Sequence, residues 1–455
     1  MRNWRLALAC ALCGALLAFG SIVTSLVADQ TRWDVPALNY SRVPHALPVA
    51  SPAHVSGDLW SADGLPVVVV SGSPREMGRR YGQAVSDLIH RGMNDYLYKR
   101  VIQDQGYSME YLLECARAML PHIAPEYVEE MKGVAEGAGV TFDQVLAMHA
   151  HADVVHYGHD WGKQEREPGQ AAGCSNFAAW GPLTVDGALI HGRNLDWTIG
   201  SGVQESAVVY VGIPQRGHPF ALVTYAGMIG AVTGMSARGI TFGEMTSQTG
   251  DETLAGEPLF IVCRRILQYS DDIESAMQIV RDYPGTTGWN FIIASGPEHT
   301  ARACEVDAGD KVIMLPDDPG ENDPPLSKGH PNALYRTNHP TSPLILEKVA
   351  RKYGITNLEL GKVLLRSLET WQRYETLRLW TTDRYAGKID ERAALAMLQS
   401  EPISAGNTLH SVVFVPERLR MWVANASALP DPRPAWDEAY HLIDLGELVK
   451  QAGAR

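Results

Sequence analysis

The stretch EPGQAAGCSNFAAWGPLTVDGALIHGRNLDW (residues 167–197) has a lone Gly-Cys step between a polar run and two short apolar runs. These runs, NFAAWGPLT and ALIHGRN, are typical of β-strands, and the VDG between them is typical of a hairpin turn. A hairpin brings HGRNLDW on the return strand back to the start of the first strand. The stretch therefore predicts that Cys174 lies beside Arg193 and Asp196.

Further short apolar runs, separated by turn residues, predict a series of strands after the hairpin. Consecutive strands with tight turns, such as SARG at residues 236–239, favour antiparallel sheets. Since strands and helices occur in blocks, the sequence predicts an α+β protein. The expected strands are residues 205–213, 219–227, 230–236, 239–246, 289–296 and 300–307, and the expected helices are residues 257–269, 271–283 with an Asp271-x-x-Glu274 cap, and 358–382.

The chain before the hairpin has a different pattern of apolar residues, which predicts mostly helices. Residues 29–60 are Pro-rich and predict an extended arm, residues 65–70 predict a buried strand, and the following residues up to about 160 have helical periodicity. Met77 and Tyr81 are expected on one buried helix face. Residues 315–332 predict a long loop.

Composition limits the possible partners. The 455 residues are 45% apolar and 20% charged, which is typical of a globular protein with a large core. The formal net charge of −13 argues against nucleic acid as a partner, because nucleic-acid-binding proteins usually have a basic face.

The N-terminal stretch predicts export. Arg2 and Arg5 precede an uncharged, mostly apolar run at residues 6–28, as in a targeting segment. The run is long for a signal peptide and long enough to span a bilayer, so a periplasmic, secreted or lumenal protein and one anchored to a membrane by residues 6–28 are both open.

Cys174 is the candidate nucleophile among the four cysteines that follow residue 28. A thiol attacks efficiently only as a thiolate, so it needs a base. Attack of Cys174 on its own Gly173 carbonyl would cut the 173–174 bond and free an α-amine, which titrates near neutral pH and can act as that base. Gly173 suits this step because it has no Cβ to hinder the approach of the thiol.

Two charged residues on the return strand fit the same chemistry. A carboxylate at Asp196 can hold the new ammonium, and a guanidinium at Arg193 favours the thiolate. The simpler alternatives are that Cys174 is a buried strand cysteine and that Arg193 and Asp196 form a structural ion pair on a sheet edge.

The Gly-Cys step, the DG turn and HGRNLDW together resemble the cysteine N-terminal nucleophile hydrolases of the isopenicillin N acyltransferase (acyl-CoA:6-aminopenicillanic acid acyltransferase) family, related to choloylglycine hydrolases and acid ceramidase. SPREMGRRYG and EEMKGVAEGAGV before the cysteine resemble segments of the same family. So do GMIGAVTGMSARGITFGEMT, YRTNHPTSP and SLETWQRYETL after it. The likeness runs over residues 65–425, with the motifs in the order of the family.

This resemblance implies a four-layer αββα sandwich with antiparallel sheets. It divides the chain into a targeting segment (residues 1–28), an N-terminal helical, propeptide-like segment (29–173) and a catalytic domain (174–455). It also implies that Cys174 is the nucleophile, that Asn338 donates to the oxyanion, and that Arg373 supports the site.

Three site residues leave alternatives open. Glu244 stands where many relatives have an oxyanion asparagine, so either a backbone N–H substitutes there or Glu244 binds the substrate. Asn338 alternatively caps a turn before Pro340. Arg373 alternatively is an exposed helix residue paired with Glu369.

The segment HAHADVVHYGHD has four possible metal ligands, which are His149, His151, His156 and His159. The spacing matches no zinc-ligand pattern, so a polar helix end leading into a linker is preferred over a metal site.

The predicted reaction is attack of Cys174 on an amide carbonyl, an acyl-thioester intermediate, and acyl transfer to water or an amine, with no cofactor. Acyl amino acids, β-lactams, lipid amides and small peptides all fit as substrates, and the two processed chains are expected to stay associated. The alternatives are a thioester-dependent N-acyltransferase and a catalytically inactive binding protein of the same fold.

Overall fold

The computed structural model describes residues 35–157, 173–323 and 326–454. Residues 38–455 belong to one compact unit, and the expected targeting segment, residues 1–28, lies outside the described residues. Within the described ranges, no helix has the length and apolar character needed to cross a bilayer.

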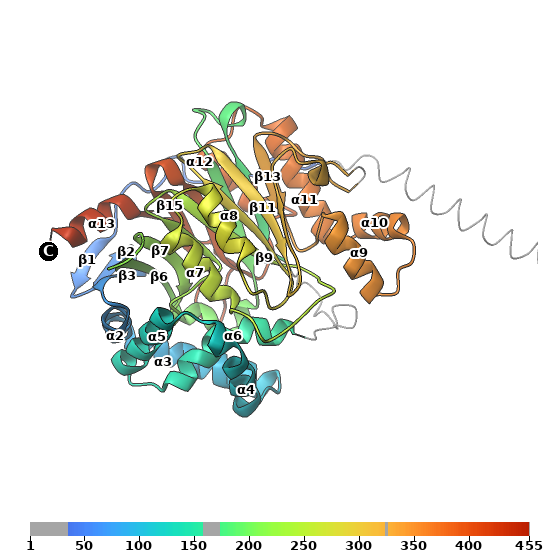
Figure 1. Cartoon of the computed structure of the whole chain (residues 1–455). Coiled ribbons are helices and arrows are strands. Elements are labelled where there is room, and N and C mark those ends of the chain that lie inside the picture. The colour runs from blue at the N-terminus through green and yellow to red at the C-terminus, as the bar shows by residue number, and fades with distance from the viewer. Residues whose placement is uncertain (1–34, 158–172, 324–325, 455) are drawn as a thin grey trace, which may run out of the picture. The chain divides into compact units, whose positions relative to one another are not determined.

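Two β-sheets form the centre of the compact unit (Figure 1). Among the described strands, every neighbouring pair is antiparallel except β3 with β6. The ten-stranded sheet has, in spatial order, β1 (Ala53–Ser56), β2 (Leu59–Ala62), β3 (Leu65–Gly72), β6 (Ala207–Pro214), β7 (Phe220–Tyr225), β8 (Thr233–Ser236), β9 (Ile240–Thr246), β10 (Trp289–Ser295), β11 (Thr300–Val306) and β12 (Lys311–Met314). The six-stranded sheet has β13 (Ala333–Arg336), β4 (Ser175–Ala179), β5 (Ile190–Asp196), β14 (Thr408–Val415), β15 (Arg420–Asn425) and β16 (His441–Asp444).

Helices precede, interrupt and follow the strands in the chain. Before the hairpin lie α2 (Pro74–Ala84), α3 (Ser86–Gly92), the π-helix η1 (Met93–Asp104), α4 (Met109–Met119), α5 (Pro125–Ala138) and α6 (Phe142–His156). After it lie α7 (Leu259–Tyr269), α8 (Ile273–Arg281), α9 (Pro343–Lys352), α10 (Leu358–Arg366), α11 (Glu369–Leu379), the π-helix η7 (Trp380–Arg384), α12 (Glu391–Leu398) and α13 (Leu445–Gly453). Short 3₁₀ turns are η2 (Leu120–His122), η3 (Gly181–Leu183), η4 (Ile199–Ser201), η5 (Val203–Ser206), η6 (Pro319–Glu321), η8 (Pro416–Arg418) and η9 (Ala435–Asp437).

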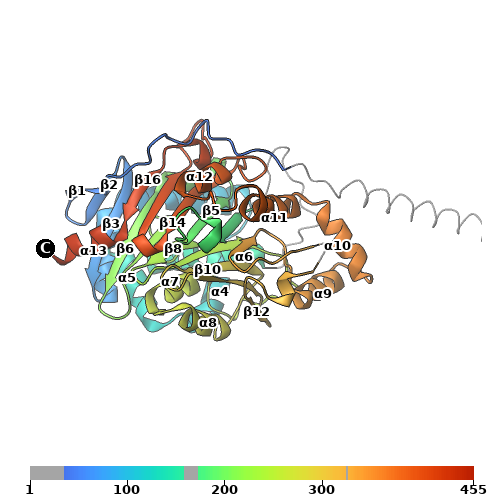
Figure 2. The same ribbon diagram turned by 90° about the horizontal axis from the view of Figure 1, so that it is seen from above.

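The elements stack in four layers, which Figure 2 shows edge-on. Helices α7 and α8 cover the outer face of the ten-stranded sheet, and α11 and α12 cover the six-stranded sheet. Val67 and Val209 of the first sheet pack against Val412 and Phe414 of the second. The predicted α+β class and the four-layer αββα arrangement are therefore confirmed, with one parallel strand pair in an otherwise antiparallel pattern.

The two glycine-rich stretches before the cysteine form a single helix pair. A Cβ at Gly78 of α2 would overlap the backbone carbonyl of Glu130, and one at Gly133 of α5 would overlap that of Arg75. The two backbones can approach this closely only because both positions lack side chains. Residues 38–157 thus belong to the same compact unit as the sheets, through this pair and through the pairing of β3 with β6.

Most predicted strands are confirmed within one or two residues, and Met77 and Tyr81 are both buried. Three predictions were wrong in part. The arm at residues 29–60 ends in the hairpin β1–β2, since alternate residues from Trp60 onward are buried. The helix expected at residues 358–382 is broken, because the backbone at Leu368 is extended.

The third partial error concerns the cap of α8. The side chain of Asp272 accepts from the backbone N–H of Ser275 at 2.8 Å, one position later than predicted. Asp271 instead lies 2.9 Å from the His218 ring.

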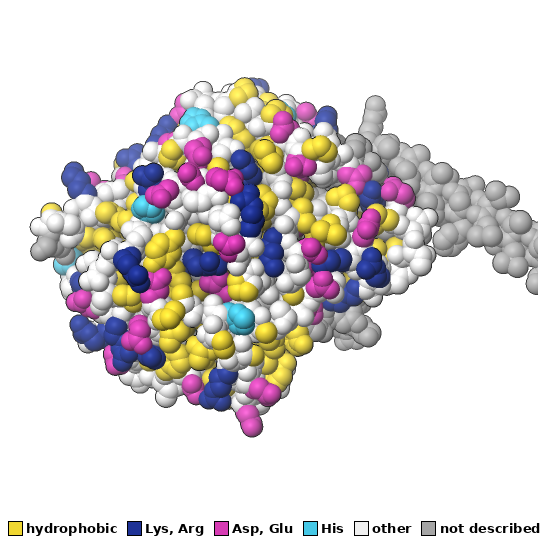
Figure 3. Space-filling model, viewed as in Figure 1, with side chains coloured by type: hydrophobic (Ala, Val, Ile, Leu, Met, Phe, Trp, Pro, Cys, Tyr) yellow, Lys and Arg dark blue, Asp and Glu magenta, His cyan; other side chains and the backbone are white. Residues whose placement is uncertain are grey.

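The surface carries charges of both signs. On the face seen in Figure 3, Lys and Arg side chains are interspersed with Asp and Glu over the helices and loops. This distribution agrees with the net charge of −13 in giving that face no continuous basic area for a phosphate backbone.

Candidate active site

The predicted hairpin places Cys174 at the start of β4. Strands β4 and β5 pair antiparallel, with Ser175 opposite Asn194 and Asn176 opposite Arg193. Continuing this register sets Gly173 opposite Asp196. The strand expected at residues 176–184 ends earlier, at Ala179, because the chain turns into η3 before it returns.

Arg193 brings a buried positive charge to the thiol. Its Nη2 lies 3.9 Å from Cys174 Sγ and 3.4 Å from Glu244 Oε2, and its Nη1 donates to the Val232 carbonyl at 2.7 Å. The side chain crosses from the six-stranded sheet to β9, where a Cβ at Gly243 would crowd it. The predicted proximity of Arg193 to Cys174 is confirmed.

The alternative of an Arg193–Asp196 ion pair on a sheet edge was wrong. Strand β5 is an interior strand between β4 and β14, and the carboxylate that pairs with Arg193 is Glu244. Residues three apart on a strand point to opposite faces, which separates the two side chains.

Asp196 has one carboxylate oxygen without a partner. Its Oδ1 accepts from the Thr408 hydroxyl at 2.6 Å, whereas its buried Oδ2 has no hydrogen bond. Burial raises the pKa of Asp196 to about 7, and the guanidinium of Arg373 opposes that rise. A cation formed at residue 174 would face this oxygen and would favour its ionised form.

The thiol itself is poorly reactive in the uncleaved chain. Cys174 is 3% exposed, and burial raises the pKa of its thiol to about 11, although Arg193 and the backbone N–H of Asp196 favour the thiolate. At neutral pH the sulfur is therefore protonated, and attack requires a base.

Asn338 and Arg373, which are far apart in sequence from the hairpin, meet at its first residues. Arg373 Nη1 donates to the Cys174 carbonyl at 2.5 Å and to Ser175 Oγ at 2.9 Å, and its Nη2 donates to Asn338 Oδ1 at 3.1 Å. Asn338 Nδ2 donates to the Thr246 carbonyl at 2.8 Å. The side chain of Asn338 is thus part of this cluster in addition to lying in a turn.

The alternative of an exposed Arg373 was wrong. Its side chain is fully buried, although its Nε does lie 3.3 Å from Glu369 as that alternative expected. Gly173 abuts the same pair, because a Cβ there would overlap Arg373 Nη2 and Asn338 Oδ1. No larger residue fits at position 173 in this arrangement.

Glu244 faces the site with its side chain and has no free backbone donor. Its N–H already donates to the Val232 carbonyl at 3.1 Å, so this particular N–H is not available as the oxyanion donor. Its Oε1 is buried without a partner. Burial raises the pKa of Glu244 to about 7, and Arg193 opposes the rise.

Two cavities meet at Cys174, and Trp197 and Thr246 line both. The first, called here the apolar cavity, has a volume of about 70 Å³ and is lined by Met148, Leu195, Met228, Phe260 and other apolar side chains, together with Glu244. The second, called here the polar cavity, has a volume of about 150 Å³ and is lined by Gly173, Asp196, Gln248, Asn338, Glu369 and Thr370 among others.

The histidines expected at a polar helix end are buried in α6 instead, which corrects that prediction. His149 lies 2.8 Å from the Val145 carbonyl through Nδ1 and accepts from the Ile229 N–H at 2.9 Å through Nε2. His151 is bonded through both ring nitrogens as well. Neither ring has an atom left for a metal ion, and His159 lies outside the described residues.

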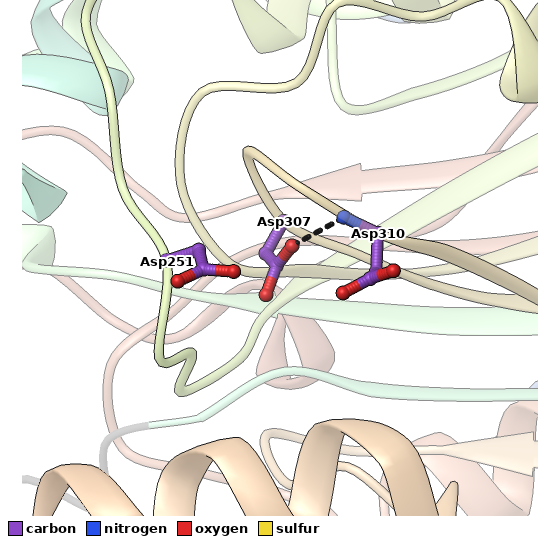
Figure 4. A group of neighbouring side chains, drawn as sticks. All are labelled: Asp251, Asp307 and Asp310. Carbon is purple, nitrogen blue, oxygen red and sulfur yellow. Dashed lines mark hydrogen bonds between the residues drawn. The ribbon is translucent and has the colours of Figure 1, made fainter.

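Among the described residues, one group of carboxylates is close enough together to hold a cation: Asp251, Asp307 and Asp310 (Figure 4). The ammonium of Lys348 already pairs with all three carboxylates, at 2.5 Å from Asp251 and 3.1 Å from Asp307 and in contact with Asp310. The group therefore acts as an anchor between α9 and two loops.

Two residues of the cavities were missed from the sequence. Trp197 stood in the quoted HGRNLDW motif directly after Asp196, and that neighbourhood was the available signal. Tyr96 had none, because it lies in the π-helix η1, far from the hairpin in sequence, and reaches the apolar cavity only through the tertiary fold.

Comparison with known proteins places the chain in a family. The model of the acyl-coenzyme A:6-aminopenicillanic acid acyl-transferase family matches residues 183–428, which is more than half of the chain. The chain belongs to this family. The matched residues include Arg193, Asp196, Glu244, Asn338 and Arg373 and begin after Cys174.

Curated relatives are more distant. Protein dcd1B of Dictyostelium discoideum is 26% identical over 46% of this chain and 39% of its own length. Protein dcd1A of the same organism is 22% identical over 58% of this chain and 61% of its own length. An uncharacterized protein of Archaeoglobus fulgidus is 26% identical over 50% of this chain and 40% of its own length. The chain spans about two-fifths to three-fifths of the length of these relatives.

Solved structures with a partial likeness include a Caenorhabditis elegans N-acylethanolamine-hydrolyzing acid amidase ortholog, at a TM-score of 0.39 and 14% identity, covering 59% of this chain and 100% of that one. A conjugated bile acid hydrolase from Clostridium perfringens has a TM-score of 0.37 at 11% identity, covering 60% and 93%. Penicillin V acylase from Agrobacterium tumefaciens has a TM-score of 0.35 at 13% identity, and the match covers 57% of this chain and 84% of that one.

Proposed function

We propose that the protein is a cysteine amidase or acyltransferase that activates itself by cutting its chain between Gly173 and Cys174. The observation that carries the proposal is the meeting of Cys174 and Gly173 with Asp196 and Asn338 around one cavity, with the Arg193 guanidinium 3.9 Å from the thiol. These residues come from three separate parts of the chain. Together they supply a nucleophile, a charge for its thiolate, a holder for an α-amine and an oxyanion donor.

In the self-cleavage step, Cys174 Sγ attacks the Gly173 carbonyl carbon. The S–C bond forms, the C–N bond to residue 174 breaks, and the thiol proton moves to the departing nitrogen. Water then hydrolyses the thioester and leaves a carboxylate at Gly173, a free thiol and a free α-amine at Cys174. Because Gly173 lies opposite Asp196 in the strand register, the new ammonium forms beside the unpartnered Asp196 Oδ2.

In turnover, the neutral α-amine takes the thiol proton while Sγ attacks the amide carbonyl of the substrate. Asn338 donates to the oxyanion, after it exchanges the Thr246 carbonyl for the substrate oxygen. The C–N bond breaks, and the leaving amine takes the proton back from the α-ammonium. Water or an amine then attacks the thioester and releases the acyl group.

Glu244 is proposed to bind the substrate beside Cys174. It lines the apolar cavity next to Cys174 and its buried Oε1 has no partner, so a hydrogen-bond donor of the substrate close to the scissile carbonyl would satisfy it. The substrate is a small molecule with an amide bond; acyl amino acids, β-lactams, lipid amides and peptides are the classes to be compared.

The test is intact mass and N-terminal sequencing of the purified protein. The wild type should give two chains, the larger beginning at Cys174, and Cys174→Ala should remain one chain. The two chains should elute together under native conditions, because β3 pairs with β6 and the buried Glu130–Arg264 pair joins α5 to α7 across the cut. Active wild-type protein without a new N-terminus at residue 174 would contradict self-cleavage, and stable uncleaved protein without turnover would favour the binding-protein alternative.

A thioester-dependent transferase is the second candidate, because the matching family is described by an acyl-coenzyme A donor. Acyl-coenzyme A thioesters should then acylate Cys174, and an amine acceptor should outcompete water. Product analysis with and without the amine separates this activity from amide hydrolysis.

Export remains a proposal from residues 1–28. Fractionation of the producing cells, with and without those residues, tests it: the full chain should leave the cytoplasm and the shortened one should not.

A further inference from the structure

We propose that the apolar cavity takes the acyl group of the substrate, that this group is short and apolar, and that Trp197, held by Tyr96 and His151, sets its length. This inference rests on the proposed function of Cys174 and names the substrate class of that same site.

The first step is to decide which cavity takes which half of the substrate. The leaving amine must receive a proton from the α-amine of Cys174, so it must depart on the side where that amine lies. Gly173 and Asp196, which flank the position of the new amine, line the polar cavity and are absent from the lining of the apolar one among the described residues. The amine half therefore belongs in the polar cavity and the acyl half in the apolar cavity.

The second step is the size of the apolar cavity. An apolar cavity of about 150 Å³ holds a benzene molecule of six carbons. On that scale the volume of about 70 Å³ beside Cys174 accommodates roughly three carbons. Propionyl, butyryl and isobutyryl groups fit this space, whereas a fatty acyl chain fits only if a side chain that lines the cavity moves.

The third step concerns Trp197, the side chain that lies between the two cavities. Trp197 lines both cavities, and its indole Nε1 donates to the Tyr96 hydroxyl at 3.2 Å. The Tyr96 hydroxyl lies 2.7 Å from His151 Nε2, and His151 Nδ1 lies 2.9 Å from the Met148 carbonyl.

The chemistry of these groups sets the direction of the bonds. A carbonyl only accepts, so His151 Nδ1 carries the proton and Nε2 accepts from Tyr96, whose oxygen in turn accepts from Trp197. Burial lowers the pKa of His151, which favours this neutral form.

The hydrogen bonds among Trp197, Tyr96 and His151 hold the three side chains in one arrangement. Each polar atom of Tyr96 and His151 has a partner, and the rings of Tyr96 and His151 meet edge to face at 5.1 Å. Turning Trp197 aside for a longer acyl chain would break the bond from its Nε1 to the Tyr96 hydroxyl, which costs free energy. Trp197 is therefore a specificity-determining residue, and Tyr96 and His151 are positioning residues that act through it.

The test uses a series of N-acyl p-nitroanilides, from acetyl through butyryl and hexanoyl to decanoyl, with the processed enzyme. The wild type should show a kcat/KM at least about tenfold higher for butyryl than for decanoyl. Trp197→Ala joins the two cavities and should reverse that preference. Tyr96→Phe keeps the ring but removes the hydrogen bonds, so it should lower the butyryl-to-decanoyl ratio severalfold.

Tyr127→Phe is the matched control. Tyr127 is buried and its hydroxyl has no hydrogen bond, but it lines neither cavity, so the ratio should stay at the wild-type value. The acyl-enzyme trapped on Cys174, weighed by mass spectrometry, gives a second readout that turnover does not limit.

The outcomes separate the inference from the function on which it rests. A processed wild type that prefers decanoyl, or Trp197→Ala and Tyr96→Phe variants with an unchanged ratio, would overturn the inference and leave the amidase intact. A processed enzyme that neither hydrolyses nor becomes acylated by any member of the series would overturn the proposed function itself.

Discussion

At the scale of single residues, the site depends on groups that are buried before any substrate is bound. The Cys174 thiol, the Asp196 carboxyl and the Glu244 carboxyl each have a pKa that burial raises. Arg193 and Arg373 are fully buried cations that oppose these rises. The uncleaved chain therefore holds an uncharged thiol beside the Arg193 guanidinium, and the base that activates it for turnover is expected to appear only when the chain is cut.

Asn338→Ala should be processed and folded but should turn over substrate about 10²–10³ times more slowly, since loss of one oxyanion donor has this effect. The variant also loses the bond to the Thr246 carbonyl, so circular dichroism and thermal unfolding should accompany the kinetics. Near wild-type turnover would mean that Asn338 only holds the loop.

Asp196→Asn should lower turnover by about 10²-fold, because a neutral amide cannot keep the α-ammonium in register with the carbonyl under attack. Selective acetylation of the Cys174 amine should silence the enzyme, because an amide nitrogen cannot take the thiol proton. Asp153→Asn is the matched control: Asp153 is equally buried, with a pKa raised to about 7, but lines neither cavity. If the acetylated enzyme stayed active, the base would lie elsewhere.

At the scale of elements, position is decided by close contacts at glycines. Helices α2 and α5 approach through Gly78 and Gly133, and a Cβ at Gly243 of β9 would overlap the side chain of Asn176 and crowd that of Arg193. The break between α10 and α11 lets Leu368 line the polar cavity beside Glu369. These features place helices and loops around the hairpin without contributing a reactive group.

Gly78→Ala should destabilise the uncleaved Cys174→Ala protein by about 1–3 kcal/mol, because the added methyl group overlaps the Glu130 carbonyl. Gly453→Ala in α13 is the control. It has open space around it and should be neutral or stabilising by up to about 1 kcal/mol. Urea unfolding of both variants measures the difference, and equal midpoints would contradict the close contact.

At the scale of the whole compact unit, the buried carboxyls tie stability to pH. Burial raises the pKa of Asp153, Asp196 and Glu244 to about 7 from the usual values near 4. The folded state thus binds protons that the unfolded state releases between about pH 4 and 7. The stabilisation from these groups is complete below about pH 4 and is lost as the pH rises to about 7.

The buried histidines act in the opposite sense, because burial lowers the pKa of His149 to about 4 and the pKa of His191 and of His339 to about 3. The contribution of one carboxyl is therefore isolated by Asp153→Asn in the uncleaved Cys174→Ala protein, which removes one titrating group. Relative to Cys174→Ala alone, this variant should lose more melting temperature at pH 5.5 than at pH 7.5, by a few degrees. Differential scanning calorimetry of both proteins measures this difference, and a difference that stays constant with pH would contradict the raised pKa of Asp153.

The sequence by itself determined the hairpin, the run of strands, the α+β class, and the proximity of Cys174 to Arg193. These follow from periodicity and turn residues within short stretches, which local physical chemistry decides. The roles of Asn338 and Arg373 were available only by resemblance to a family, since nothing local links them to residue 174.

Only the tertiary structure decided that Arg193 pairs with Glu244, that Arg373 is buried against the Cys174 carbonyl, and that Tyr96 holds Trp197 between two cavities. These contacts join segments that are distant in the chain, and each depends on how the two sheets and their helices pack. The periodicity of a segment records which face is buried, but it does not record which distant side chain is buried against that face.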